Sequence, residues 1–253
     1  MMFDFKFLKR KKKELTLEEI QKTLGNELSF SASEAYKLLR ANLAFSFPDE
    51  KGCKIIGITS ATNGEGKSTT SINLAYAIAQ AGERVLLLDG DMRLPTIAKK
   101  LSMNSTPGLS NVLAGQSDVN KAIKPSKLHE LMKIMPAGDT PPNPSELINS
   151  AKMESVLKEL SEDFDYIIID LPPINVVVDA AVIAKKINGV IIAVRRNYCG
   201  KSEVDAAVKQ LEFANARLLG FVFTGAQGEG RGYRRYGKYK YYSYGGKSSK
   251  EKK

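Results

Sequence analysis

Continuous apolar runs alternate with helical patterns along most of the chain. The apolar runs are rich in Ile, Leu and Val and lack polar alternation, as expected for strands with both faces covered. Longer segments between them carry apolar residues at helical spacing. This alternation predicts an α/β fold, a doubly wound and mostly parallel sheet flanked by helices. The expected strands are 54–59, 84–88, 131–135, 166–169, 190–194 and 218–223, and the expected helices between them are 68–81, 143–161, 179–187 and 201–215.

The segment before the first strand also carries helical signals. Residues 14–24 predict a short helix. Ser31 and Glu34 have the spacing of a capping box, which predicts a second helix from Ser31 to about Phe45. The stretch 102–144 is irregular, and within it we expect only a short helix at 108–114.

The hydrophobic pattern ends after Gly225. Residues 230–246 contain no Leu, Ile or Val and are rich in glycine, charge and tyrosine, so we expect a disordered tail. We therefore divide the chain into a basic N-terminal segment (1–30), an α/β domain (31–228) and a basic tail (229–253). The tail holds six of the ten tyrosines, namely Tyr233, Tyr236, Tyr239, Tyr241, Tyr242 and Tyr244.

Composition and charge narrow the possible environment. A hydrophobic content of 43% over 253 residues is enough for one substantial core. No apolar run approaches the roughly 20 residues that a membrane-spanning helix needs. Cys53 and Cys199 lie far apart and form no metal-ligand spacing, which indicates free thiols in a reducing cytosol. His129, the single histidine, is expected in a surface loop.

The net charge of +10 is concentrated at the two ends. Residues 1–13 carry +5 and residues 231–253 carry +8, which leaves −3 on the 217 residues between them. A nucleic-acid-binding domain would carry its basic patch on the fold itself, so we expect no nucleic-acid partner. Cationic ends favour an anionic membrane surface or an acidic partner, although solvated tails would have the same composition.

A phosphate-binding loop follows the first expected strand. Residues 60–69 read SATNGEGKST, and the next residues open a helical pattern. Loop amides, the helix N-terminus and the Lys67 ammonium would bind phosphate oxygens, and the Ser68 hydroxyl would bind Mg²⁺. An isolated GKS could equally be an ordinary helix cap, but the strand before it favours a nucleoside triphosphate site. The expected nucleotide-binding residues are Asn63, Gly64, Glu65, Gly66, Lys67, Ser68 and Thr69.

Three aspartates follow two of the other expected strands. Asp89 and Asp91 come directly after 84–88, and Asp170 ends 166–170. If the backbone stays extended, Asp89 and Asp91 project from the same face at the edge where α/β sheets bind ligands. Alone, Asp89-Gly90 would suit a polar turn. Beside a triphosphate, the acids suit a magnesium site, with Asp170 in the form of a Walker-B aspartate.

In combination, these motifs resemble the bacterial tyrosine kinases that regulate capsular and extracellular polysaccharide production. The likeness covers roughly residues 30–244: the loop 64–69, the segment LLLDGDMR at 86–93, the segment IIIDLPP at 167–173 and the tyrosine-rich tail. It implies a P-loop NTPase fold of the deviant-Walker type. Segment 31–47 matches the family's ring-assembly helix, with Glu34, Lys37 and Arg40 in its motif. Lys37 departs from the family's arginine and cannot make a bidentate fork.

The resemblance implies that ATP, with Mg²⁺, phosphorylates protein tyrosines. In this scheme Lys67 holds the phosphates and Asp89 accepts the tyrosine proton. Ser68 ligates the metal, while Asp91 and Asp170 order its water ligands. Arg93 is a candidate support for the metal-side carboxylates.

The family also implies partners and a location. The tail tyrosines would be substrates within a ring-shaped homo-oligomer, for which an octamer is the candidate size. Other protein tyrosines would be further substrates. A separate transmembrane activator of the polysaccharide-copolymerase type would recruit the cytoplasmic kinase to the inner face of the membrane.

Three other functions are compatible with parts of the pattern. A partitioning or division-site ATPase would dimerise on ATP without phosphorylating protein, but it carries a signature lysine where this chain has Thr62. A scaffold or chain-length protein could sense ATP. A nucleic-acid binder could stack bases on the tail tyrosines. The tyrosine-rich tail and the missing lysine favour the kinase.

Overall fold

The computed structural model describes residues 16–48 and 50–225. Among these residues, seven strands form a single sheet in the order β3-β4-β2-β5-β1-β6-β7. All neighbouring strands are parallel except β3 and β4. The strands are β1 (Lys54–Ser60), β2 (Val85–Asp89), β3 (Lys124–Pro125), β4 (Met132–Met135), β5 (Tyr166–Asp170), β6 (Gly189–Arg195) and β7 (Leu218–Thr224).

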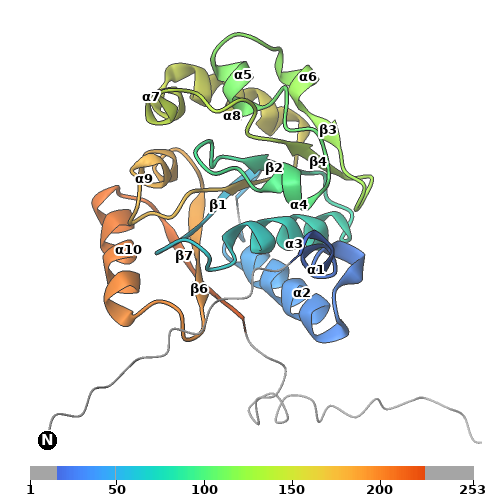
Figure 1. The fold of residues 1–253 in the computed structure, drawn as a ribbon, viewed down its shortest axis with the longest axis vertical. Helices are drawn as coiled ribbons and strands as arrows, with labels where there is room; N and C mark the ends of the chain where they lie inside the picture. Colours follow the sequence, from blue (N-terminus) through green and yellow to red (C-terminus); the bar gives the residue numbers. More distant parts are fainter. Residues whose placement is uncertain (1–15, 49, 226–253) are drawn as a thin grey trace, which may run out of the picture.

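Helices cover both faces of the sheet, as Figure 1 shows. One apolar cluster joins the sheet to α2, α3 and α4, and a second joins it to α5, α6 and α8 to α10. The helices are α1 (Leu17–Gln21), α2 (Phe30–Phe45), α3 (Lys67–Ala79), α4 (Ile97–Lys100), α5 (Leu109–Leu113), α6 (Val119–Ala122), α7 (Pro144–Asn149), α8 (Ala151–Asp163), α9 (Asp179–Ala184) and α10 (Lys201–Phe213), with a 3₁₀ turn, η1, at Gly25–Glu27.

The predicted α/β architecture is confirmed, and the central strands explain why the pattern was visible in the sequence. Strands β1, β2, β5 and β6 are almost completely buried, because helices pack on both of their faces. The expected short helix at 108–114 is present as α5. Strand β3 was not predicted, because a pairing of two residues leaves no hydrophobic period.

Two helix predictions are wrong in detail. The expected helix 143–161 is two helices, because Ser150 adopts an extended conformation and its hydroxyl accepts the Met153 N–H to begin α8. The helix assigned to a Ser31 cap begins earlier. Its cap is Ser29, whose hydroxyl accepts the Ala32 N–H, so Ser31 lies within α2.

The N-terminal helices pack on the core through a polar anchor. Thr16 forms a capping box with Glu19 at the start of α1. The Asn73 side chain in α3 accepts the Gly25 N–H and donates to the Thr23 carbonyl oxygen. Leu24 is buried beside these contacts. None of the helices in the described ranges combines the length and apolar character that crossing a bilayer requires.

Candidate functional site

A tight loop joins β1 to α3 at residues 61–66. Gly64 and Gly66 have φ of 81° and 90°, a region that L-residues rarely adopt. A Cβ at Gly66 would also make a tight contact of 3.1 Å with the Thr224 hydroxyl oxygen, which adds to the preference for glycine there. The first turn of α3, with Lys67, Ser68 and Thr69, follows directly. Free backbone amides at such a helix start bind phosphate oxygens.

The Glu65 side chain connects this loop to the rest of the protein through hydrogen bonds. Its carboxylate is fully buried and accepts the Thr62 N–H at 2.6 Å and the Thr62 hydroxyl at 3.0 Å. The other carboxylate oxygen accepts the Arg195 N–H at 3.2 Å and the Cys199 thiol at 3.0 Å. The side chain of this expected nucleotide-binding residue is therefore engaged by the protein. The distant partners Arg195 and Cys199 carried no signal in the sequence.

The three aspartates lie together beside the loop. Strands β2 and β5 pair in a register that sets Asp89 opposite Asp170, and Asp91 follows two residues later. The Lys67 ammonium lies 2.9 Å from an Asp91 oxygen and 3.8 Å from an Asp170 oxygen. All four residues are buried. The structure thus brings together the residues that the sequence assigned to one site.

Burial and mutual repulsion shape the charges of these groups. Burial, and then the Asp170 charge, raise the pKa of Asp89 to about 8. Burial also raises the pKa of Asp170. Burial alone would lower the pKa of Lys67, but the nearby Asp170 and Asp91 carboxylates outweigh it and raise that pKa. The acids therefore favour a nearby positive charge.

The donor set fits Mg²⁺. Carboxylate and hydroxyl oxygens are the ligands that Mg²⁺ prefers, and phosphate oxygens and water complete its shell. The Asp170 Oδ1 accepts the Ser71 hydroxyl at 3.2 Å, whereas Oδ2 accepts no hydrogen bond from the described residues. Within the described ranges, no group of three His, Cys, Asp or Glu side chains could hold a metal by itself. Ser71 was missed by the sequence analysis, although it lies one helical turn after Lys67.

The expectation that Arg93 supports the metal-side carboxylates is wrong, because Arg93 forms its hydrogen bonds elsewhere. Its guanidinium donates to both Asp179 oxygens, at 2.7 and 3.3 Å, and to the Ser145 hydroxyl at 2.8 Å. Ser145 in turn donates to the buried Asp179 at 2.6 Å. Arg93 instead connects the loop after β2 to α7 and α9, because the topology places the N-termini of these helices beside that loop.

The remaining predicted residues lie outside this cluster. On α2, Glu34 pairs with Lys37 at 2.8 Å on a half-exposed surface, and Arg40 is partly buried on the same helix. Cys53 and Cys199 are free thiols. His129 is partly buried, with its ring edge against Tyr76. The six tail tyrosines lie outside the described residues.

Comparison with known proteins places the chain in a family. Residues 53–218 match the family described as "AAA domain". The tyrosine-protein kinase CpsD of Streptococcus agalactiae is 36% identical over 207 residues, which cover 81% of this chain and 89% of CpsD. The chain belongs to the bacterial tyrosine-protein kinases. Another CpsD, at 38% identity, and YwqD of Bacillus subtilis, at 36%, are also named tyrosine-protein kinases.

Solved structures of the family share the fold. The kinase domain of the Escherichia coli tyrosine kinase ETK aligns with a TM-score of 0.75 at 28% identity, over 88% of this chain and 87% of that domain. The chimerical protein CapA2B2 aligns with a TM-score of 0.72 at 37% identity, over 76% of this chain and 84% of its own. The site described above thus lies within a tyrosine kinase fold.

Proposed function

We propose that this tyrosine kinase transfers the γ-phosphoryl group of ATP, with Mg²⁺, to tyrosine hydroxyls, and that its own C-terminal tyrosines are among the substrates. The observation that carries the proposal is the convergence of Asp89, Asp91 and Asp170 on Lys67 at the start of α3. Phosphoryl transfer depends mainly on positioning and on neutralising charge. A lysine and hard oxygen ligands beside a phosphate loop supply both.

Each group would have a distinct role. The amides of the loop and the Lys67 ammonium would hold the phosphates, which would compete with Asp91 for this lysine. When bound, Mg²⁺ would be held by Ser68, with Asp91 and Asp170 through water, and would neutralise phosphate charge. Asp89 would accept the proton of a phenol whose pKa is near 10.

Asp89 is held rigidly for this role. Its two carboxylate oxygens accept the Asp91 N–H at 3.3 Å and the Ile97 N–H at 3.2 Å. The Asp89 side chain is fully buried, so a tyrosine hydroxyl can reach it only when the residues that cover it move aside. A positive charge brought in with the nucleotide would lower the pKa of Asp89 and favour the ionised base.

The family resemblance supports the finer parts of the proposal. The tail would be phosphorylated between protomers of a ring assembled through α2. Each phosphate would add about −1.5 to −2 charges and oppose the tail's positive charge. A separate membrane activator would bring the kinase to the inner membrane face, where it would regulate capsular or extracellular polysaccharide synthesis and export.

The alternative is an ATPase of the partitioning or division-site type. Such a protein uses a signature lysine at the position of Thr62. Here the Thr62 N–H and hydroxyl are both bound to Glu65, which favours an internal structural role for this residue. The kinase proposal is therefore the better supported of the two.

The test is phosphotyrosine mapping after incubation of the full chain with its activator fragment and labelled ATP. We expect label in the tail of the wild type and none in Asp89→Ala or Lys67→Met. Asp118→Ala, which changes an exposed acid at the start of α6, is the matched control and should label normally. Replacing all six tail tyrosines by phenylalanine should abolish autophosphorylation; undiminished label would refute the tail as substrate. ATP-driven dimerisation without label would favour the alternative.

A further inference from the structure

Lys100 brings a second lysine to the phosphate loop. It is the last residue of α4, and its ammonium lies 3.4 Å from the hydroxyl oxygen of Thr69. Thr69 lies in the first turn of α3, directly after Ser68. The loop motif predicts Lys67 but not Lys100, which is separated from it by 33 positions. Only the fold places the two lysines at one helix start.

Asp89 anchors the start of the helix that carries Lys100. The first residue of α4, Ile97, donates its N–H to Asp89 at 3.2 Å. A helix of four residues has little freedom between that anchor and Lys100. The electrostatic environment agrees: besides burial, which lowers the pKa of Lys100, the Asp170 charge raises that pKa and the Lys67 charge lowers it. Lys100 therefore lies within electrostatic range of the site.

Within residues 16–48 and 50–225, Lys100 has no anionic partner. It is partly buried, yet among the described residues no carboxylate lies within ion-pair distance, and its hydrogen-bond partner is a neutral hydroxyl at long range. An ammonium has three N–H donors, and a partly buried charge is costly unless it is paired. The group is therefore suited to bind an anion that arrives at the start of α3.

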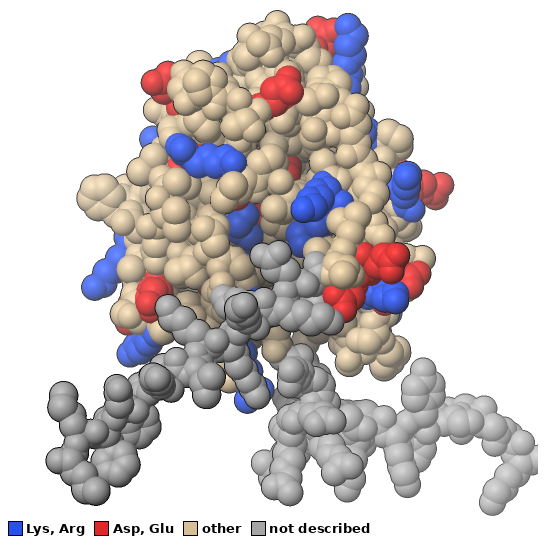
Figure 2. Space-filling model, viewed as in Figure 1, with Lys and Arg blue, Asp and Glu red and all other residues tan. Residues whose placement is uncertain are grey.

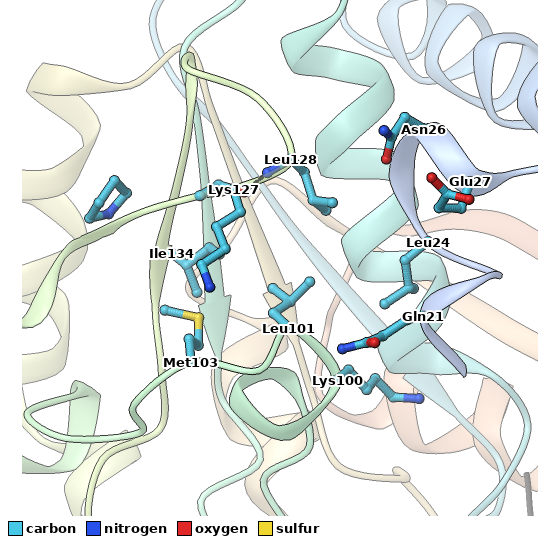
Figure 3. A pocket seen from close by; sticks show the side chains of 12 residues that line it. Gln21, Leu24, Asn26, Glu27, Lys100, Leu101, Met103, Lys127, Leu128 and Ile134 are labelled. Carbon is cyan, nitrogen blue, oxygen red and sulfur yellow. Dashed lines mark hydrogen bonds between the residues drawn. The ribbon is translucent and has the colours of Figure 1, made fainter. Parts of the chain in front are cut away.

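Lys100 borders a cavity of about 210 Å³. Leu24, Leu101 and Met103 line this cavity together with polar residues such as Gln21 and Glu27. Figure 3 shows Lys100 extending away from Leu101 and Met103, past Gln21. Figure 2 shows basic side chains near the middle of this face, over the region of β1, β2 and α4 in Figure 1.

We propose that Lys100 binds phosphate oxygens of the nucleotide from the Thr69 side of the loop. Because Lys67 lies with Asp91 and Asp170, where the metal and the transferred group are expected, Lys100 is assigned to the diphosphate part that ATP and ADP share. It acts in nucleotide binding and not in the chemical step. The inference rests on the proposed nucleotide site.

The test measures Mg·ATP and Mg·ADP affinity of the full chain by titration calorimetry. Lys100→Met should weaken both nucleotides by about tenfold, as expected for one lost hydrogen bond to a charged group. At saturating ATP, the phosphorylation rate should stay within about twofold of the wild type, because the contact is made equally in the ground and transition states. Lys99→Met is the matched control, since Lys99 is exposed on the same helix, and its affinities should be unchanged.

Two further variants show whether a loss of nucleotide affinity comes from the missing charge or from disturbed folding. Lys100→Arg keeps the charge and should retain most of the affinity, whereas Lys100→Gln keeps a polar end group without the charge and should lose about as much as Lys100→Met. Unchanged affinity in Lys100→Met, or a loss confined to ATP, would overturn the assignment. A wild type that binds nucleotide but never labels tyrosine would refute the proposed kinase chemistry and leave the role of Lys100 standing.

Discussion

Replacing Glu65 by glutamine should loosen the phosphate loop without altering any group that contacts substrate through its side chain. The carboxylate accepts four hydrogen bonds in a fully buried position. Glutamine has almost the same shape, but its NH₂ group would replace one of the two accepting oxygens. This donor would then face two groups that donate to Glu65 in the wild type. Whichever way the amide is oriented, the hydrogen bond from the backbone N–H on that side would be lost, and the Thr62 hydroxyl or the Cys199 thiol on that side would have to turn from donor to acceptor.

The size of the effect follows from these contacts. Hydrogen bonds to charged groups contribute about 1.5–3 kcal/mol each, and the remaining oxygen keeps weaker versions of its own bonds. We therefore expect the free energy of unfolding to fall by about 2–4 kcal/mol in Glu65→Gln. With a urea m-value of about 2–3 kcal/mol per M, the midpoint of unfolding should fall by about 1 M.

Urea unfolding followed by circular dichroism provides the assay, with Mg·ADP affinity measured in parallel. Glu83→Gln, at an exposed acid, is the surface control and should unfold like the wild type. Cys199→Ser keeps a donor toward Glu65 and should cost less than Glu65→Gln. If the midpoint of Glu65→Gln lies within about 0.2 M of the wild type, the four contacts do not stabilise the loop and the reasoning fails.

Three other predictions concern groups outside the phosphate loop. Hydrogen bonds from Arg84 lower the pKa of Asp165, so the stability of this pair is present at neutral pH and lost as pH falls below about 4. Asp165→Asn should reduce the acid dependence measured by urea unfolding at pH 7 and pH 3; an unchanged dependence would contradict the pairing. Burial raises the pKa of Cys53 to about 12, so iodoacetamide at pH 8 should alkylate it far more slowly in the folded than in the urea-unfolded chain, as read by mass spectrometry; equal rates would show an accessible thiolate. Arg93→Met and Asp179→Asn should give a coupling energy of about 1–3 kcal/mol in a double-mutant cycle of unfolding, and simple additivity would exclude their ion pair as a stabilising contact.

Much of the fold could be read from local patterns. The buried strands β1, β2, β5 and β6 are continuous apolar runs, and a continuous run is a local property of the sequence. The loop glycines and Lys67 form a contiguous motif because the proposed phosphate site is built from a strand end, a turn and a helix start that follow one another in the chain. The two helix errors occurred where a local signal had a competitor. Ser29 and Ser31 are equally good caps in sequence, and Ser150 starts a helix inside an apparently continuous helical pattern.

The sequence alone thus predicted the class of fold and the phosphate loop, because these depend on neighbouring residues and on fixed periods, whereas the roles of the three aspartates at the loop were assigned through the family resemblance. Tertiary structure decided the pairings between distant residues. Arg93 contacts Asp179, which lies 86 positions further along the chain, and Glu65 contacts Cys199, 134 positions further along. Lys100 contacts Thr69, which lies 31 positions before it. Such contacts depend on the order and register of strands and on how helices pack against them, which no local pattern encodes.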